Sequence, residues 1–545
     1  MPEFDPVTLE VQWQRLVAIV DEMDTATIRT SFSTIVGESH DFGCVLMDHA
    51  GRGLAQAQWS PPQFCTMLPI TTAHMLRKFG TEALRPGDVL ITNDPWIGST
   101  HLPDYNLISP VFHRGRLVAF LGTVAHVSDV GGHQGDLEAV DVFQEGTRLM
   151  PTFFFRDGRP VEIVHEFIAA NCRVPELVLG DLNAIVGTQR LAAERLQEFL
   201  TDYSLDTLEA LSSEIMGRSE AALRRAIAAL PDGSTSCEMT ADGYFEPFTL
   251  RVRIDIRGSD MYFDFAGSSP EVRNAAINAA FNMTYSTTVY PIKCMLAPRI
   301  PNNDGLVRPL HVRAPEGSIV NCRFPAPVKA RAKVMKHIVP LIFAALAPML
   351  PDEVIAAAGG IFPFQFLGTD PRYGTFNVHV LPHGGTGATK HQDGWPPVAY
   401  PHNSFITPAE IMELRSPVLM RRKALIPDSG GAGRRRGGLG QEFVLECVAA
   451  EPITCTIRPD LIRFPAPGLL GGRAGRLGEV LLNGARLERF PPIEFRPGDV
   501  LTIRVPGGGG FGNPQEREPE RVRADIVEGI VSPAAARTTY GVEVN

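Results

Sequence analysis

The fold of the N-terminal part of the chain is decided by residues 88–126, which read DVLITNDPWIGSTHLPDYNLISPVFHRGRLVAFLGTVAH. The apolar run Asp88–Thr92 predicts a strand that leads into a polar loop at residues 93–104. Asn106–Phe112 and Leu117–His126 are two further apolar segments joined by HRGR, so they predict a β-hairpin. Because rigid scaffolds often carry functional groups on loops that leave strands, the loop at 93–104 is the first candidate site.

The segments around this stretch predict a mixture of helices and strands. Apolar residues recur at helical spacing through Leu9–Thr30, a second helix is expected at Thr71–Phe79, and Cys44–Met47 reads as a strand. Residues from Asp181 to Leu230 are rich in Ala, Leu, Arg and Glu and poor in Gly and Pro, which indicates two or three consecutive helices. The N-terminal part is therefore expected to be α+β, followed by a helical segment.

The next part of the chain repeats the mixture. Leu250–Ile256 and Met261–Phe265 alternate like strands, and Asn274–Leu296 is apolar enough to form a buried helix. Another helix is expected at Met335–Leu346, where Pro340 must either open the helix or kink it.

Glycine density rises after Gly368, in the segments HGGTGAT (383–389), DSGGAGRRRGGLGQ (428–441) and PGGGGFGNP (506–514). These segments separate expected strands such as Glu442–Ala449 and Val500–Val505, so the C-terminal third is expected to be β-rich with long loops. The overall expectation is an α+β fold of several mixed layers, arranged in one compact unit. Its regions are 1–180 (α+β, with the candidate site), 181–230 (helical), 231–367 (α+β) and 368–545 (β-rich).

Composition excludes several classes of protein. The 545 residues include 51 Lys and Arg against 61 Asp and Glu, a net charge of −10 that lacks the basic footprint of a nucleic-acid-binding protein. The eight cysteines contain no C-x-x-C pair, so neither a zinc knuckle nor a redox pair is expected. The N-terminal residues do not resemble a signal peptide, and the apolar run Ile338–Leu350 is broken by two prolines and too short to cross a bilayer. We therefore expect a cytoplasmic protein that binds neither membranes nor nucleic acid.

Two histidines and an aspartate are expected to meet near the hairpin. His101 and Asp104 are three residues apart with Pro103 between them, which places them on a turn rather than on one face of a helix. The second hairpin strand returns His126 to the place where the hairpin begins, and Asp41 precedes another expected strand and can add a fourth ligand. Imidazole and carboxylate groups suit a Zn, Mn or Fe(II) site with open positions. A structural role for each residue taken alone stays open.

The glycine-rich segments do not match known catalytic loops. Arg434, Arg435 and Arg436 stand among glycines and can hold an anion, but the chain has no GxxxxGK[ST] sequence, so a nucleotide-binding P-loop is not expected. No G-x-S-x-G elbow is present either, which argues against a serine hydrolase. A turn or a contact with another subunit is the expected role of these segments.

Several motifs in order along the chain carry a resemblance to a known family. They are NDPWIGSTHLPD (93–104), AHVSDVGG (125–132), FQEGTRLMP (143–151), FDFAGSS (263–269), PEGSIVNCRFPAPV (315–328), DSGGAGRRRGGLG (428–440) and PGGGGFGNP (506–514). Together they resemble the hydantoinase B/oxoprolinase family over essentially the full length.

The resemblance implies a B-type subunit of an ATP-dependent hydrolase that opens a hydantoin, oxoproline or lactam ring. An A-type partner in a hetero-oligomer would use ATP and Mg²⁺ to phosphorylate the amide oxygen, and this chain would receive the activated species at a divalent transition metal. The implied metal ligands are Asp41, His101, Asp104 and His126. Glu145, Asp129 and His133 are then candidates for the general base or for groups that orient the ligands.

Two segments depart from the pattern of the family, and two other functions stay open. Residues 62–65 read Pro-Gln-Phe-Cys where many relatives have histidine, and Gln134-Gly135-Asp136 replaces the more usual Pro-Gly, so the identity of the substrate is open. The first alternative is a subunit of an ATP-dependent ketone carboxylase of the acetone or acetophenone type. The second is a scaffold without catalytic activity, which the presence of all four ligand positions disfavours.

Overall fold

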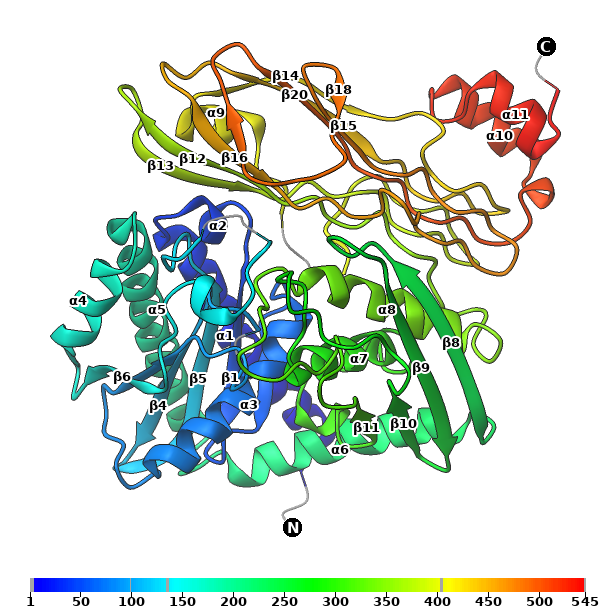
Figure 1. The fold of residues 1–545 in the computed structure, drawn as a ribbon. Helices are drawn as coiled ribbons and strands as arrows, with labels where there is room; N and C mark the ends of the chain where they lie inside the picture. Colours follow the sequence, from blue (N-terminus) through cyan, green and yellow to red (C-terminus); the bar gives the residue numbers. More distant parts are fainter. Residues whose placement is uncertain (1–3, 99, 134–136, 402–404, 544–545) are drawn as a thin grey trace.

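A seven-stranded antiparallel sheet forms the centre of the N-terminal half (Figure 1). The computed structural model describes residues 4–98, 100–133, 137–401 and 405–543. The order of the strands is β2-β1-β5-β4-β3-β6-β7, and the expected hairpin is formed by β4 and β5. The strands are β1 (Phe42–Asp48), β2 (Gly53–Gln56), β3 (Val89–Thr92), β4 (Asp104–His113), β5 (Arg116–His126), β6 (Thr152–Arg156) and β7 (Arg159–Pro160).

Helices cover both faces of this sheet. In β1, Cys44 and Leu46 join the core that contains α1 (Pro6–Thr30) and α5 (Pro175–Asp202), whereas Val45 and Met47 join the core that contains α3 (Pro62–Phe79). Burial on both faces explains why β1 is apolar along its length instead of alternating. The remaining helices of this half are α2 (Thr34–Gly37), α4 (Glu162–Ala170) and α6 (Glu209–Ala228).

Helix α3 starts nine residues before the expected Thr71. Pro62 occupies its first turn, where a residue without an N–H group costs no hydrogen bond, and Pro69 lies inside the helix. Pro62 and Pro69, which in the sequence suggested that no helix starts before Thr71, are therefore both part of α3.

A second sheet of four strands lies beside the first and is covered by two helices (Figure 1). It has the order β11-β10-β9-β8, and α7 (Phe281–Leu296) and α8 (Ala332–Leu346) share its core. Pro340 lies in the middle of α8 and therefore does not open it. The strands are β8 (Gly233–Ala241), β9 (Phe248–Arg257), β10 (Asp260–Asp264) and β11 (Leu310–Arg313).

The C-terminal third contains two further sheets that share one core, and it lies across the N-terminal two thirds in Figure 1. One sheet has the order β13-β12-β16-β19, with β12 (Phe364–Asp370), β13 (Gly374–Val380), β16 (Ile453–Ile457) and β19 (Ile493–Phe495). The other has the order β14-β15-β20-β17-β18, with β14 (Val418–Leu425), β15 (Gln441–Cys447), β17 (Glu479–Leu482), β18 (Ala485–Arg486) and β20 (Val500–Arg504). Short helices complete this part: α9 (Ala409–Arg415), α10 (Pro519–Val527) and α11 (Pro533–Tyr540).

The glycine-rich segments pack backbone against backbone beside these sheets. We call residues 384–387, 430–440, 468–475 and 507–510 the glycine bundle. Gly508 donates to the carbonyl of Gly438 at 3.0 Å, and its own carbonyl accepts from Gly431 at 2.8 Å. A Cβ atom on Gly508 would lie 2.0 Å from the carbonyl oxygen of Thr386, and one on Gly437 would lie 2.0 Å from the oxygen of Gly508. No side chain fits between these backbones.

The α+β class expected from the sequence is confirmed. The core that contains α1 and α5 also takes in Leu211, Ile215 and Met216 of α6, so the helical segment packs directly on the N-terminal α+β region. Within the described ranges no helix combines the length and the apolar character needed to span a lipid bilayer.

Candidate metal centre

Strand pairing gathers four polar residues at one edge of the N-terminal sheet. Asp104 is the first residue of β4, His126 is the last residue of β5, and the two are direct cross-strand partners. The carbonyl of His101 accepts the backbone N–H of Asp104 at 3.1 Å, which closes the turn before β4. Asp41 precedes β1, and its carbonyl accepts the backbone N–H of His126 at 3.0 Å. Hairpin formation therefore positions the whole set.

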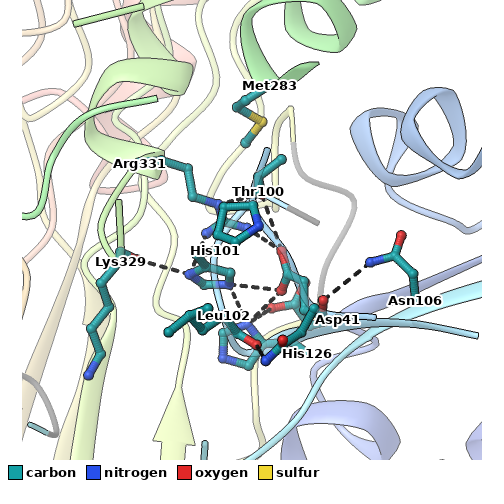
Figure 2. A network of polar contacts seen from close by, with 12 residues as sticks. Asp41, Thr100, His101, Leu102, Asn106, His126, Met283, Lys329 and Arg331 are labelled. Carbon is teal, nitrogen blue, oxygen red and sulfur yellow. Dashed lines mark hydrogen bonds and ion pairs between the residues drawn. The ribbon is translucent and has the colours of Figure 1, made fainter. Parts of the chain in front are cut away.

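The side chains of these residues converge (Figure 2). His101 Nε2 lies 2.8 Å from Asp104 Oδ1 and 3.2 Å from His126 Nδ1, and His126 Nδ1 lies 3.2 Å from Asp104 Oδ1. Asp41 Oδ2 lies farther out, at 3.7 Å from His126 Nδ1. We call His101, Asp104 and His126 the ligand triad, and Asp41 is a fourth group at its edge.

The geometry of the ligand triad fits a transition-metal ion. Neighbouring ligand atoms that each bind an ion at about 2.0–2.2 Å lie about 3.0–3.5 Å apart, close to the separations in the triad. With a metal on Nε2 of His101, the neutral ring must carry its proton on Nδ1, and the Lys329 carbonyl is 2.9 Å away to accept it. That arrangement excludes the alternative in which Nδ1 accepts from Arg331 Nη1 at 3.1 Å. Two imidazoles and a carboxylate are also the donors that Zn, Mn or Fe(II) prefers.

Arg331 fixes the carboxylate of the triad. Its Nη2 donates to Asp104 Oδ2 at 2.7 Å and its Nε donates to Thr100 Oγ1 at 2.6 Å, so Oδ1 remains free to face the two imidazoles. Burial acts to raise the pKa of Asp104, but the nearby His101 and Arg331 hold it well below its usual value. Burial, together with Arg331, lowers the pKa of His101 to about 3. The carboxylate is therefore ionised and the imidazole neutral near pH 7, as metal ligands must be.

A cavity of about 110 Å³ opens beside the triad. Its lining includes His101, His126 and Asp41 together with Gln63 and Phe64 of α3. The segment that departs from the family pattern thus contributes directly to the wall. The other departing segment, residues 134–136, lies outside the described residues.

The three expected acid–base candidates occupy different positions. Glu145 is buried behind the cavity wall, where its Oε1 accepts the backbone N–H of Lys329 at 2.8 Å and burial raises its pKa to about 7. Asp129 lines a small cavity next to the triad, and its carboxylate forms an ion pair with Arg173 at 3.0 Å. His133 is exposed, and its carbonyl accepts a hydrogen bond from the ammonium of Lys329. A role for any of them as general base stays a prediction.

Several residues beside the triad were missed by the sequence analysis. His379 of β13 lies with its ring centroid 5.8 Å from that of His126, and burial holds its pKa well below the usual value. Five cationic side chains also line the cavity. Four of them come from the sequence KARAKVMK at 329–336, whose four cations in eight residues were a visible signal, and the fifth comes from a distant segment. The five are Lys329, Arg331, Lys333, Lys336 and Arg458.

Arg434, Arg435 and Arg436 lie in the glycine bundle and are not among the described residues that line the two cavities beside the triad. Arg436 is buried, donates to the Gly437 carbonyl at 2.8 Å and lies 3.5 Å from the carboxylate of Asp525. Its backbone N–H donates to Asp393 at 2.7 Å. This arginine is engaged inside the C-terminal region.

Comparison with known proteins identifies relatives along the whole chain. The family model described as hydantoinase B/oxoprolinase matches residues 5–514. A Pseudomonas protein named as the B-type subunit of a D-/L-hydantoinase is 30% identical over 571 aligned positions, which cover 100% of this chain and 96% of that protein.

Two solved structures share the fold. The crystal structure of an ATP-dependent caprolactamase from Pseudomonas jessenii matches with a TM-score of 0.89 and 28% identity, covering 99% of this chain and 97% of that one. Acetone carboxylase in a nucleotide-free structure matches with the same TM-score of 0.89 but 20% identity, covering 99% of this chain and 80% of that one. At that identity the likeness concerns the fold alone.

Proposed function

The chain belongs to the hydantoinase B/oxoprolinase family, and from this premise we propose that it is the metal-dependent B-type subunit of an ATP-dependent cyclic amide hydrolase. The observation that carries the proposal is the ligand triad, whose three ligand atoms lie 2.8–3.2 Å apart at the wall of a cavity. The substrate is a ring amide that an A-type partner has activated by ATP-dependent phosphorylation. The names of the relatives, a hydantoinase subunit and an ATP-dependent caprolactamase, support this choice of reaction.

The division of labour follows from the chemistry of amides. An unstrained amide is a poor electrophile, but phosphorylation of its oxygen creates a good leaving group on the carbon that water must attack. A divalent metal held by His101, Asp104 and His126 would supply Lewis acidity, which brings the pKa of water toward neutrality. The sequence has no GxxxxGK[ST] loop, which supports placing ATP and Mg²⁺ on the partner subunit.

The residues of this chain prepare the site before substrate arrives. Arg331 holds one carboxylate oxygen of Asp104, so that the other is oriented toward the two imidazoles. The Lys329 carbonyl selects the tautomer of His101 that leaves Nε2 free. Asp41, whose pKa is raised by burial, is close enough to act as a further ligand or to hold a proton at the edge of the triad.

A ketone carboxylase subunit is the second candidate function. Acetone carboxylase and the caprolactamase match this chain with the same TM-score of 0.89, so the fold alone does not separate the two reactions. Identities of 30% and 28% with the hydantoinase and caprolactamase proteins, against 20% with the carboxylase, favour the hydrolase. A scaffold without catalysis remains third, because all four ligand positions are filled.

The test is an ATP-dependent screen of the full chain co-expressed with its A-type partner. Hydantoins, oxoproline, lactams and ketones are offered with and without bicarbonate, and products and ADP are measured together. The proposal expects ring opening that needs ATP, both subunits and a metal, and does not need bicarbonate. Carboxylation that requires bicarbonate would establish the second candidate instead. ATP hydrolysis by the isolated chain at a kcat above about 1 s⁻¹ would contradict the division of labour.

A further inference from the structure

The cavity beside the ligand triad carries an excess of positive charge. Among the described residues its lining includes the five cations named above, whereas Asp41 is its one carboxylate. Charges removed from water are costly unless they are paired, so each cation needs an anion close by. The positions of the carboxylates just outside the cavity show which of these cations have an anionic partner.

Only part of this charge is neutralised by the protein. Arg331 has Asp104 as its partner at 2.7 Å. Lys333 and Lys336 share the single buried carboxylate of Asp460, at 3.4 Å and 3.0 Å. The imidazole of His337 also lies 2.9 Å from Asp460, so one carboxylate serves three nitrogen groups.

Arg458 has no carboxylate partner within 4.0 Å among the described residues, and its side chain faces the same cavity. Burial, together with the charge of Arg331, lowers the pKa of Arg458 to about 10, which still leaves the guanidinium charged at pH 7. Within the part of the chain that the structure describes, the ammonium of Lys329 donates to the neutral carbonyl of His133 and forms no ion pair within 4.0 Å. Arg458 and Lys329 are therefore the two cations of the cavity without an ion-pair partner within 4.0 Å among the described residues, although the carboxylate of Glu145 acts on both from farther away.

The size and charge of the cavity restrict the anion. A volume of about 110 Å³ is small beside the roughly 300–1,000 Å³ of sites for nucleotides and drug-sized ligands, so the ligand is a small group. The five cations outnumber the nearby carboxylates of Asp41, Asp104, Asp460 and Glu145, so the cavity favours an anionic ligand. Arginine also presents a fork of donors that suits phosphate oxygens.

We propose that Lys329, Lys336 and Arg458 form a binding site for the phosphoryl group of the activated substrate, in the cavity that His101 and His126 of the ligand triad also line. This inference rests on the proposed function and deepens it, because it assigns the part of the substrate that the cationic wall recognises. The wall binds the phosphoryl oxygens, and the carbon that bears them is thereby held toward the imidazoles. In the hydrolytic step water adds to that carbon and the C–N bond of the ring breaks, with the protons of the water moving to the ring nitrogen, which leaves an acyl phosphate. A second water then attacks the acyl carbon, the bond between that carbon and the phosphoryl oxygen breaks, and the released phosphate stays paired with Arg458 and Lys336.

The test measures binding without turnover, so that its outcome is independent of the reaction. Inorganic phosphate, methylphosphonate and bicarbonate are titrated into the full-length chain by calorimetry, with the metal content of each sample measured by elemental analysis. Arg458→Met is the test variant and Lys336→Met is the second. Arg463→Met is the matched control, because Arg463 follows closely on the same segment but is half exposed and contacts Asp242.

The proposal expects phosphate and methylphosphonate to bind more tightly than bicarbonate. Arg458→Met and Lys336→Met should each lower the affinity for phosphate and for methylphosphonate at least tenfold, with unchanged metal content. Arg458→Lys should keep part of the affinity. Arg463→Met should bind both ligands as the wild type does. Equal affinity in wild type and Arg458→Met would overturn the site. If bicarbonate binds more tightly than phosphate, the assignment to a phosphoryl group is overturned. If phosphate binds but methylphosphonate does not, the site accepts only free phosphate, and its proposed role in binding the phosphorylated substrate is overturned. If phosphoryl binding behaves as expected but no ring amide is opened, the proposed function fails while the anion site stands.

Discussion

The ligand triad and the glycine bundle are both built from conspicuous sequence motifs, yet they work in opposite ways. In the triad, strands β4 and β5 supply a rigid frame, and the proposed function depends on the side chains that the frame carries to one edge. In the glycine bundle the side chains are missing because the backbones themselves are in contact, with carbonyl oxygens where Cβ atoms would lie. A conspicuous motif can therefore mark a chemical site or a packing site. Substitutions separate the two, because the first loses chemistry and the second loses the fold.

The largest expected effect is on chemistry, from His101→Ala. Removal of one ligand of the triad should release or greatly weaken the metal and lower coupled activity by at least about 100-fold, since even groups outside the ligand shell cost 10–100-fold. The variant should still fold, because the site lies on a turn and strand ends. Elemental analysis and activity are measured on the same preparation.

His311→Ala is the control for this substitution, because His311 is exposed and pairs with Asp260 far along the second sheet. Full activity of wild-type enzyme without stoichiometric metal would remove the triad from the mechanism. A variant that keeps its metal but loses activity would instead make His101 a group that contacts the substrate.

The second effect is on the fold, from Gly508→Ala in the glycine bundle. A methyl group 2.0 Å from the Thr386 carbonyl oxygen cannot be accommodated unless the backbones separate, which should cost about 3 kcal/mol or more. We expect little soluble protein, or a clearly lowered melting temperature, while any folded fraction keeps its metal. A variant as stable as wild type would mean that the bundle is looser than its hydrogen bonds indicate.

A smaller effect tests the arginines of the bundle. Arg436→Met removes a donor to the Gly437 carbonyl and an ion pair with Asp525, which should cost about 1–3 kcal/mol of stability. Arg434→Met should cost less, because Arg434 is only partly buried. Melting temperature and coupled activity are measured together. Loss of activity at unchanged stability in either variant would assign these arginines to the contact with the partner or to an anionic intermediate.

The fold of the triad region follows from the sequence because its signals are local. Alternating turns and apolar runs mark β4 and β5, and the direct pairing of Asp104 with His126 follows once the four-residue turn HRGR is placed. The start of α3 was misplaced because Pro62 and Pro69 are breakers in an isolated helix but are tolerated in the first turn and inside this packed one.

Contacts between distant segments could not be predicted in the same way. Arg331 reaches Asp104 from more than two hundred residues away, and Arg458 joins the cavity from another part of the chain. Single-sequence periodicity carries no information about such pairings. The glycine segments were expected to be turns or contacts with another subunit, because a sequence shows that glycine permits a tight approach but not which backbone approaches.

The smallest expected effect is a gain in stability from replacing glycines that, unlike those of the glycine bundle, have open space around them. Gly187 lies in the interior of α5 and Gly217 in the interior of α6, both are exposed, and a Cβ atom at either position would meet nothing within 4 Å. Because glycine has more freedom to lose than alanine when a helix forms, Gly187→Ala and Gly217→Ala should each raise the free energy of unfolding by about 0.5–1 kcal/mol. Chemical denaturation measures the change, and coupled activity should not move. If activity falls while stability rises, the affected helix face is covered by the partner subunit in the working complex. That glycine would then permit a close contact between subunits, as the glycines of the bundle permit close contacts within the chain.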